Sequence, residues 1–577
     1  MSRKGTTLID LVMSIAIIAL LFGGVYLVYF SIETAIANVS VRAAATQAIN
    51  NEIELIRNLP YASVGTVSGI PNGVIPQSQT VTQGNFTFTL QTTILNIQDP
   101  YDTSPSSSPV ADYKLVDITA SCPLCTRFIP IEITTTVAPS LLAQGTVYGS
   151  IFVYAIDANG QPVSNANIQI VNASVTPSIN LTDTTNASGV LKLIGVPTSS
   201  QGYQIFASKA GYSSAQTYPV GGASNPNPVQ PNITVASQTV SNLTFAIDRM
   251  SSLAISTANN RCQAIGNESF SIAGAKLIGT GPDVLKFSTS SKTNASGTVN
   301  FSSLEWDTYS LALSDAGKDV VGTIPLNPIT INPSTSQTFA FILQGAADPS
   351  LLVTTEDSAT GAGVTNAQVT LTRNSVSQMQ VTGQATFSQT DWSASGTYSS
   401  ASGIDTSQAG VIGLLANATS GYATTTSWLV SNTFDVGGSS STFNTITWSP
   451  ASEPTSTMLQ FQVAANNDNA TWNFIGPDGS AGTFFTATGS LPAALSGNRY
   501  FRYKVYMSTG DASTTPQLTG LTVNFTANCV PPYQVLFGNL AQANYSYDAI
   551  APNYNETSGT VLIGSGSQPL VITLTHQ

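Results

Sequence analysis

The first sixty residues combine an uninterrupted apolar run with a helical periodicity. Residues 11–30 form the run, which has about the 20 residues that a helix needs to cross a bilayer core. Beyond it, apolar side chains recur mostly every three, four or seven residues, which is typical of one helix face. They are Ile32, Ala35, Ile36, Val39, Ala43, Ile49, Ile53 and Ile56. Pro60 cannot continue a helix. The pattern predicts one long helix from Thr7 to about Asn58, with residues 6–30 as its transmembrane half.

Apolar and polar residues then alternate with period two, which is typical of half-buried strands. Clear examples are residues 85–90, 114–119 and 129–137. We expect a sheet from this region to pack on the second half of the helix, giving a domain over residues 31–140.

An internal repeat organises the chain beyond Pro139. Thr-Asn-Ala-Ser-Gly occurs at residues 185–189 and again at 293–297, each time as a turn that opens a strand. The surrounding strand and turn patterns predict two β-sandwiches, over residues 145–247 and 250–345.

A third copy of the sandwich is divided in the sequence. Residues 348–380 match its first half and residues 528–577 its second half. The residues between them, 381–527, predict an inserted jelly-roll-like sandwich, because loop tips tolerate insertions. The predicted fold class is therefore an α+β domain with one long N-terminal helix, followed by all-β sandwich domains.

The composition changes the expected partners. Only 8% of the residues are charged and the net charge is −12. An acidic chain argues against nucleic acid as a partner for the bulk of the protein, although solubility alone also explains this charge.

The N-terminal residues resemble a known family. Arg3-Lys4-Gly5 before Thr6-Thr7-Leu8-Ile9-Asp10 is similar to the leader and mature start of type IV pilins and pseudopilins. The resemblance implies a leader over residues 1–5, cut by a prepilin peptidase between Gly5 and Thr6, and methylation of Thr6. Asp10 stands where the family usually has Glu. Thr6 stands where an aromatic residue is common.

Asp10 has two interpretations. In a filament, its carboxylate would pair with the α-amino group of a neighbouring subunit's Thr6, because a charge within an apolar stretch needs a partner. In a membrane it would be solvated at headgroup depth. A secretory signal peptide would show a small-x-small cleavage site after a shorter apolar core, and none ends this run.

The sandwich segments resemble other modules. Residues 145–247, and more weakly 250–345, are similar to carboxypeptidase regulatory-like and collagen-adhesin B-type sandwiches, which are small transthyretin-like folds. Phe501-Arg502-Tyr503-Lys504-Val505 with Thr515-Pro516 resembles laminin-G or discoidin-like modules.

Four cysteines are present. Cys122 and Cys125 are spaced C-x-x-C between two predicted strands, and a second such pair or a nearby histidine for a zinc site is lacking. Two interpretations remain, a small disulfide in a hairpin turn or two free thiols. The pairing of Cys262 and Cys529 stays open.

Candidate catalytic residues are few. His576 is the only histidine, and Asp391, Asp405 and Asp435 fall in loops, where such residues more often cap turns. Asp157 begins a calcium-loop-like triplet that stops after three residues, which favours a β-turn. We therefore expect no enzyme, no cofactor and no metal. Trp428, Trp448 and Trp472 are candidates for sugar binding or for core packing.

These features predict a minor pilin-like structural subunit of a type IV pilus or related filament. Its sandwich modules would adhere to a surface polysaccharide or to a host or cell-surface ligand. The alternatives are a pseudopilin of a secretion or DNA-uptake machine, and a membrane-tethered protein that binds or hydrolyses polysaccharide. The expected partners are prepilin peptidase, the membrane, and other pilin subunits through the N-terminal helix. The expected location is the cytoplasmic membrane, as a single-pass protein with extracytoplasmic C-terminal domains, and then the cell surface or pilus.

Overall fold

The computed structural model describes most of the chain beyond residue 37. The described ranges are 38–97, 113–125, 128–138, 148–315, 317–417, 421–422 and 424–577, together with Met13, Glu33 and Ile36. The chain divides into two compact units, Met1–Arg249 with Leu277–Val284, and Met250–Lys276 with Leu285–Gln577. Each unit is described by itself.

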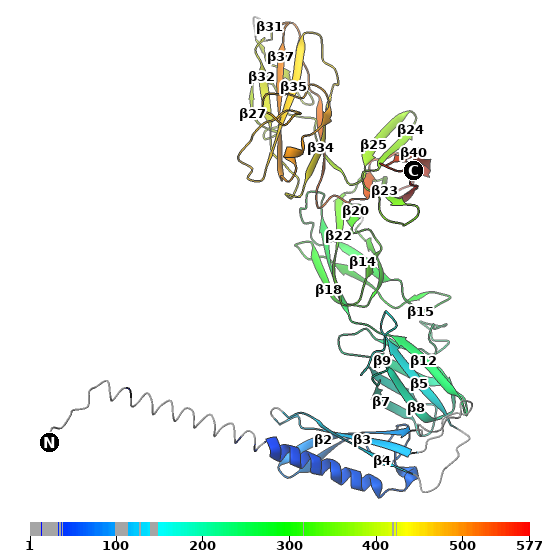
Figure 1. Cartoon of the computed structure of the whole chain (residues 1–577). Coiled ribbons are helices and arrows are strands. Elements are labelled where there is room, and N and C mark those ends of the chain that lie inside the picture. Colours follow the sequence, from blue (N-terminus) through cyan, green and yellow to red (C-terminus); the bar gives the residue numbers. More distant parts are fainter. Residues whose placement is uncertain are drawn as a thin grey trace, which may run out of the picture. The chain divides into compact units, whose positions relative to one another are not determined.

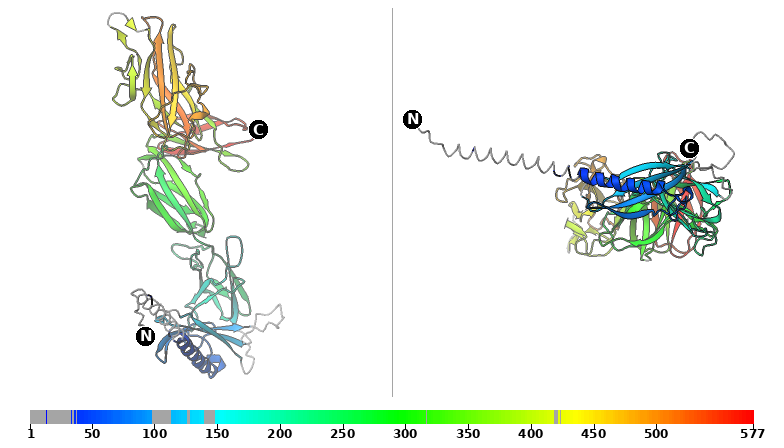
Figure 2. Two further views of the ribbon diagram at one scale, coloured as in Figure 1. Left: turned by 60° about the vertical axis from the view of Figure 1, so that its left-hand side comes forward. Right: turned by 90° about the horizontal axis from the view of Figure 1, so that it is seen from below.

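The first unit begins with a helix packed on a four-stranded antiparallel sheet (Figures 1 and 2). The helix covers residues 38–57, and the sheet follows chain order: β1 (Ser78–Gln83), β2 (Phe86–Ile97), β3 (Tyr113–Ser121) and β4 (Ile131–Val137). One helix face is buried against the sheet, through Val41, Ala45, Ala48, Ile49, Ile53 and Ile56. Ile36 and Val39 belong to the periodic pattern but are exposed.

A two-sheet sandwich completes the first unit. One sheet has the order β12-β5-β8 and the other β10-β9-β6-β7, with β11 paired to β9. The strands are β5 (Tyr148–Ile156), β6 (Asn167–Asn172), β7 (Ile179–Thr184), β8 (Val190–Pro197), β9 (Ser199–Ser208), β10 (Ala215–Gln216), β11 (Ile233–Val235) and β12 (Val240–Ala246). Alternate residues of both sheets face one core, as period-two patterning requires.

The second unit starts with a sandwich of related topology. Its sheets have the orders β18-β13-β22-β20 and β17-β14-β19-β21. The hairpin of β15 and β16 lies between β14 and β17 in the sequence, and its residues Leu277–Val284 are grouped with the first unit. The strands are β13 (Ser251–Ala258), β14 (Ser269–Gly274), β15 (Leu277–Gly279), β16 (Val284–Leu285), β17 (Ser288–Lys292), β18 (Thr298–Leu304), β19 (Asp307–Leu313), β20 (Lys318–Ile324), β21 (Ile329–Ile331) and β22 (Ser336–Gly345).

A third sandwich is assembled from two separate stretches of sequence. Its sheets are β39-β23-β42 and β25-β24-β40-β41. The strands are β23 (Ser350–Asp357), β24 (Gln368–Arg373), β25 (Val376–Val381), β39 (Gln534–Phe537), β40 (Asn544–Ile550), β41 (Thr557–Leu562) and β42 (Ser567–Leu574). In all three sandwiches the first strand pairs in parallel with the last one, β5 with β12, β13 with β22 and β23 with β42.

The repeated turn has the same geometry in the first two sandwiches. Asn186 Oδ1 accepts hydrogen bonds from the amides of Ser188 (2.9 Å) and Val190 (3.1 Å). Asn294 does the same for the residues two and four positions later. In the third sandwich, the inserted domain stands at the corresponding place, directly after Thr382. The Thr382 hydroxyl accepts a hydrogen bond from the Ala367 amide (3.0 Å), as the Thr185 hydroxyl does from the Ala166 amide (2.9 Å).

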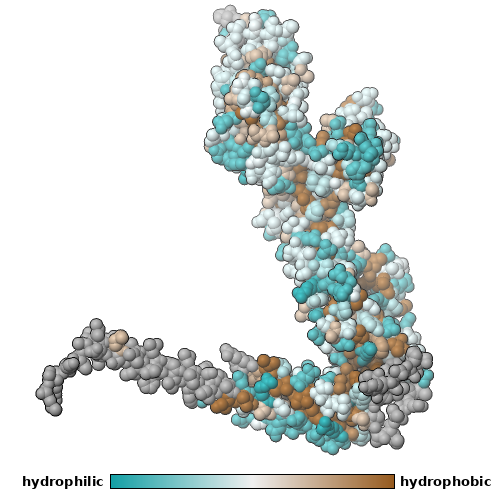
Figure 3. All heavy atoms as spheres, viewed as in Figure 1, coloured by the Kyte–Doolittle hydropathy of each residue, from teal (hydrophilic) through white to brown (hydrophobic). Residues whose placement is uncertain are grey.

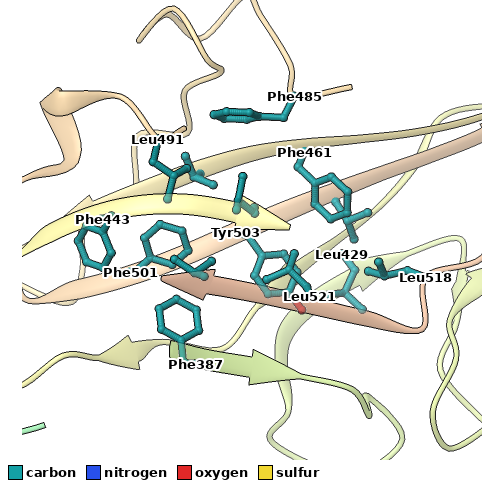
Figure 4. Close-up of a cluster of buried hydrophobic side chains, with 14 of the residues drawn as sticks. Phe387, Leu429, Phe443, Phe461, Phe485, Leu491, Phe501, Tyr503, Leu518 and Leu521 are labelled. Carbon is teal, nitrogen blue, oxygen red and sulfur yellow. The ribbon is translucent and has the colours of Figure 1, made fainter. Parts of the chain in front are cut away.

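The inserted domain is itself a sandwich, and its core is the largest cluster of buried hydrophobic residues in the described part of the chain. Its main sheets are β26-β38-β34-β36 and β27-β32-β37-β33, with β35 paired to β37. Figure 4 shows Phe501 and Tyr503 of β37 pointing into the core beside Phe387 and Phe443. The strands are β26 (Ala385–Gln389), β27 (Tyr398–Ser402), β28 (Ile404–Asp405), β29 (Gly413–Leu414), β30 (Ala416–Asn417), β31 (Gly421–Tyr422), β32 (Ser427–Ser431), β33 (Phe434–Asp435), β34 (Thr442–Ser449), β35 (Thr457–Asn466), β36 (Gly489–Ser490), β37 (Tyr500–Thr509) and β38 (Gly520–Thr526).

The fold class differs from the sequence-based prediction. Strands account for 52% of the described structure and helices for only 6%, so the protein is nearly all-β. The predicted α+β class with one long helix is therefore wrong. The reason is that strand-forming segments with period-two alternation fill most of the chain, whereas helical periodicity is confined to its first sixty residues. The described part of that segment is one short helix over residues 38–57. The rest of the segment lies almost entirely outside the described residues.

Among the described residues, no helix has the length and apolarity needed to span a bilayer. The apolar run at 11–30 lies outside the described residues, apart from Met13.

Candidate functional site

The leader and assembly residues lie outside the described residues. Gly5, Thr6 and Asp10, with the predicted leader and transmembrane half, are all in this part of the chain. Cleavage, methylation and the carboxylate–amine pairing therefore stay predictions from sequence.

Both pairs of cysteines form disulfides in the structure. Cys122 and Cys125 are joined across the turn that follows β3, within the helix-and-sheet domain. Cys262 is joined to Cys529, 267 residues later, and this bond connects the second sandwich to the end of the inserted domain. The sequence left this second pairing open because the two residues share no motif.

The three candidate acids shape separate turns. Asp391 and Asp405 each accept an amide hydrogen bond from the residue two positions later, and these bonds lower the pKa of both carboxyls. Asp435 accepts two hydrogen bonds of 2.8 Å from the Arg499 guanidinium, which lower the pKa of its carboxyl. Asp157 likewise accepts amide hydrogen bonds from Asn159 and Gln161, as a turn residue does. Hydrogen bonds of this kind hold carboxylates in loops.

His576 lies in the third sandwich against Asp357. Its Nε2 is 3.2 Å from Asp357 Oδ2, and its ring centroid is 4.2 Å from that of Tyr554. The Thr360 hydroxyl, two amides and the Tyr554 hydroxyl also donate to Asp357, which lowers the pKa of this carboxyl to about 2. These contacts hold the last residues of the chain to the sandwich. Among the described residues, no group of His, Cys, Asp and Glu side chains is arranged to hold a metal ion.

The three candidate tryptophans divide between the core and one outer face of the inserted domain. Trp448 packs on Phe461, with ring centroids 4.4 Å apart, at the edge of the core. Trp428 lies 4.7 Å from the ammonium of Lys504, and Trp472 lies 4.5 Å from the guanidinium carbon of Arg502. In the sequence, Arg502 and Lys504 stand out only as part of the segment that resembles laminin-G or discoidin-like modules. The stronger signal was that the inserted domain has only three Lys or Arg residues, all within 499–504.

Polar contacts, one of them buried, join the helix-and-sheet domain to the first sandwich. The Asn96 amide donates to the Ile194 carbonyl (2.7 Å) in a buried position, and Gln77 donates to the Asn180 carbonyl (2.8 Å). The Asn180 amide in turn donates to the Ser68 carbonyl (2.7 Å). Ile70 lies in the sandwich core. Since buried amides fix both partners in one geometry, this junction is a specific interface.

A second junction joins the three sandwiches of the second unit. Gln534 accepts a hydrogen bond from the Thr323 amide (2.7 Å) and donates to the Thr354 hydroxyl (3.0 Å), so that one side chain joins the second and third sandwiches. Gly437 of the inserted domain approaches so closely that an added Cβ would lie 1.9 Å from the Arg261 carbonyl oxygen. This contact is next to the Cys262–Cys529 disulfide.

Comparisons with known proteins give no family. No family model and no curated protein matches the chain. The solved structures to which it is similar include the Bacillus anthracis TIE protein, with 11% identity over 86% of this chain and 73% of that one (TM-score 0.16). The minor pilin GBS52 of the Gram-positive pathogen Streptococcus agalactiae has 13% identity over 35% of this chain and 97% of its own (TM-score 0.18). The shaft pilin SpaA of Lactobacillus rhamnosus GG has 12% identity over 33% and 96%, respectively (TM-score 0.13). TM-scores this low support no conclusion about fold or function.

Proposed function

We propose that the protein is a non-catalytic structural subunit of a surface filament, which displays its β-sandwich modules for adhesion. The observation that carries this proposal is the way the modules are joined. Neighbouring modules within each unit share buried hydrogen bonds, and in the second unit a disulfide as well. Fixing one module in a single orientation on the next costs conformational entropy. The specific contacts at these junctions offset that cost and so maintain the orientation. A protein that holds a binding module away from its anchor needs such junctions.

The surface composition supports an extracellular location. Figure 3 shows many residues of intermediate hydropathy on the described surface, in keeping with a chain that is only 8% charged. Two disulfides within the described residues fit an oxidising compartment.

The type IV class of the filament is the finer part of the proposal and rests on the N-terminal sequence. A prepilin peptidase would cut after Gly5, Thr6 would be methylated, and residues 11–30 would hold the chain in the cytoplasmic membrane before assembly. Asp10 would then pair with the α-amino group of a neighbouring pilin subunit. The assembled protein would reside on the cell surface.

Mass spectrometry of the mature N-terminus and immunogold labelling of surface filaments test this proposal. We expect a chain that begins at Thr6 and gold particles on filaments. We also expect Gly5→Ala to leave the leader in place, visible as a chain of higher mass. Native protein that still carries Met1, or that is released without its first thirty residues, would contradict the proposal. Release of reducing ends from polysaccharide by the purified chain would contradict the non-catalytic role.

A further inference from the structure

The outer face of β37 in the inserted domain concentrates the cations of that domain. Because side chains alternate along a strand, Phe501 and Tyr503 point into the core (Figure 4), whereas Arg502, Lys504 and Tyr506 point outward. The Cα atoms of Arg502 and Lys504 are therefore about 7 Å apart, and both side chains leave the strand on the same face. The third cation of the domain, Arg499, already pairs with Asp435.

Aromatic rings surround these two cations. The Lys504 ammonium lies 4.7 Å from the Trp428 ring and 4.8 Å from the Tyr506 ring, and these two residues face each other in the register of β32 and β37. The Arg502 guanidinium lies 4.5 Å from the Trp472 ring. A ring beneath each cation restricts its side chain and so reduces the entropy that a ligand would have to remove.

Both cations keep capacity for an anionic ligand. Within the described part of the chain, neither has a carboxylate at ion-pair distance. Arg502 donates only to the hydroxyls of Thr433 (2.9 Å) and Ser399 (3.3 Å), which leaves guanidinium N–H groups available. The domain's other cation, Arg499, is already paired with Asp435, so these two cations differ from it in having no acidic partner among the described residues.

We propose that this face of β37, formed by Trp428, Trp472, Arg502, Lys504 and Tyr506, binds an acidic polysaccharide of the uronate class. A carboxylate suits the planar guanidinium and the ammonium, while the C–H faces of the sugar rings suit the aromatic side chains. A nucleic-acid site neutralises several phosphates with clustered Lys and Arg, whereas the inserted domain has only three such residues, all within 499–504.

Binding of soluble polygalacturonate by the purified full chain, measured by isothermal titration calorimetry, tests this inference. Arg502→Gln/Lys504→Gln should weaken binding about tenfold or more, because two charge-assisted contacts are lost. Lys192→Gln/Arg373→Gln is the matched control, since both of these cations also lie over aromatic rings but in other modules. The control should bind as the wild type does, and rising salt should weaken the binding of both proteins. Thermal melting of all three proteins checks that they are folded.

A second variant tests the rings. Trp428→Leu keeps apolar cover beside Lys504 but removes the aromatic face, and binding should weaken severalfold. The inference is wrong if the Arg502/Lys504 variant binds as tightly as the wild type, or if the control loses affinity equally. It is also wrong if the wild type binds oligothymidylate or neutral dextran as tightly as polygalacturonate. The inference does not depend on filament assembly, so its failure and a failure of the proposed function are distinguishable.

Discussion

Single buried polar residues hold the ends of elements in this protein, and Lys114 shows how. Its ammonium donates to the carbonyls of Tyr61 (2.7 Å) and Val64 (2.5 Å), and it lies 4.4 Å from the Tyr61 ring. The side chain is only 5% exposed. It thereby ties the short 3₁₀ turn after the helix, Tyr61–Ser63, to strand β3. Burial lowers the pKa of Lys114 from 10.5 to about 8.

Lys114→Met should destabilise the helix-and-sheet domain. Methionine fills similar space but leaves two carbonyls without their donor, which costs about 1–3 kcal/mol of unfolding free energy. Thermal or denaturant unfolding followed by circular dichroism measures the loss. An unchanged midpoint would show that water replaces the ammonium.

The pH dependence of the same pair of proteins provides a control for this assignment. Between pH 8 and 10.5 the unfolded chain binds more protons at Lys114 than the folded chain does, because the folded pKa is the lower one. The unfolding free energy of the wild type should therefore rise with pH across this window relative to that of Lys114→Met. A constant difference between the two proteins would contradict the lowered pKa.

The sequence alone could predict the strand that carries Lys114 but not the role of the residue. Period-two alternation is visible from Lys114 to Thr119. A lysine at the start of a strand ordinarily suggests a solvated surface. Its burial depends on the chain after Pro60 returning over β3, and no local pattern encodes that contact. The same holds for Arg502 and Lys504, whose shared outer face follows from alternation but whose tryptophan partners come from distant segments.

At the scale of elements, the Thr-Asn-Ala-Ser-Gly turn shows what a repeat can encode. Gly189 and Gly297 both have φ = +70°, and a Cβ added at either would lie 2.6 Å from a carbonyl oxygen of the sandwich's first strand. Glycine is therefore required for backbone conformation and for space. Recognising the repeat was enough to place these turns. The matching position in the third sandwich has no such motif, because the inserted domain occupies it.

Gly189→Ala should destabilise the first sandwich by more than Gly160→Ala. Both glycines have positive φ, which costs alanine about 1–2 kcal/mol, but nothing lies within 4 Å of a Cβ added at Gly160. The difference between the two variants isolates the contact with the Ala155 carbonyl. Differential scanning calorimetry should show the larger decrease in melting temperature for Gly189→Ala. Equal decreases would mean that the backbone moves to accommodate the methyl group.

At the scale of the whole molecule, the sequence predicts the order of strands and modules along the chain, but not which distant residues contact one another. Strands and turns recur along the chain, so alternation indicates sandwiches. A class based on the N-terminal helix was wrong because that helix is a small part of the described structure. The Cys262–Cys529 disulfide and the Gln534 junction join residues far apart in sequence, which no spacing rule anticipates.

The inserted domain should be removable without loss of the sandwich that contains it. The chain leaves and re-enters the third sandwich at neighbouring points, since a Cβ added at Gly383 would lie 2.8 Å from the Pro532 carbonyl oxygen. Replacing residues 384–531 by a short Gly-Ser linker therefore closes a small gap, and short loops cost little closure entropy. Cys262→Ser is included so that no unpaired thiol remains.

The expected product folds, enters filaments and no longer binds polygalacturonate. Full-length Cys262→Ser/Cys529→Ser is the control, because it loses the same disulfide but keeps the inserted domain and should keep binding. Circular dichroism, immunogold labelling and titration calorimetry measure the three properties. If the deletion variant aggregates while the control folds, the third sandwich depends on the inserted domain for its stability. If it folds and still binds the polysaccharide, the binding face lies elsewhere. The proposed function requires that the anchor and the binding module be separable. A deletion variant that folds and assembles into filaments but does not adhere would therefore support it.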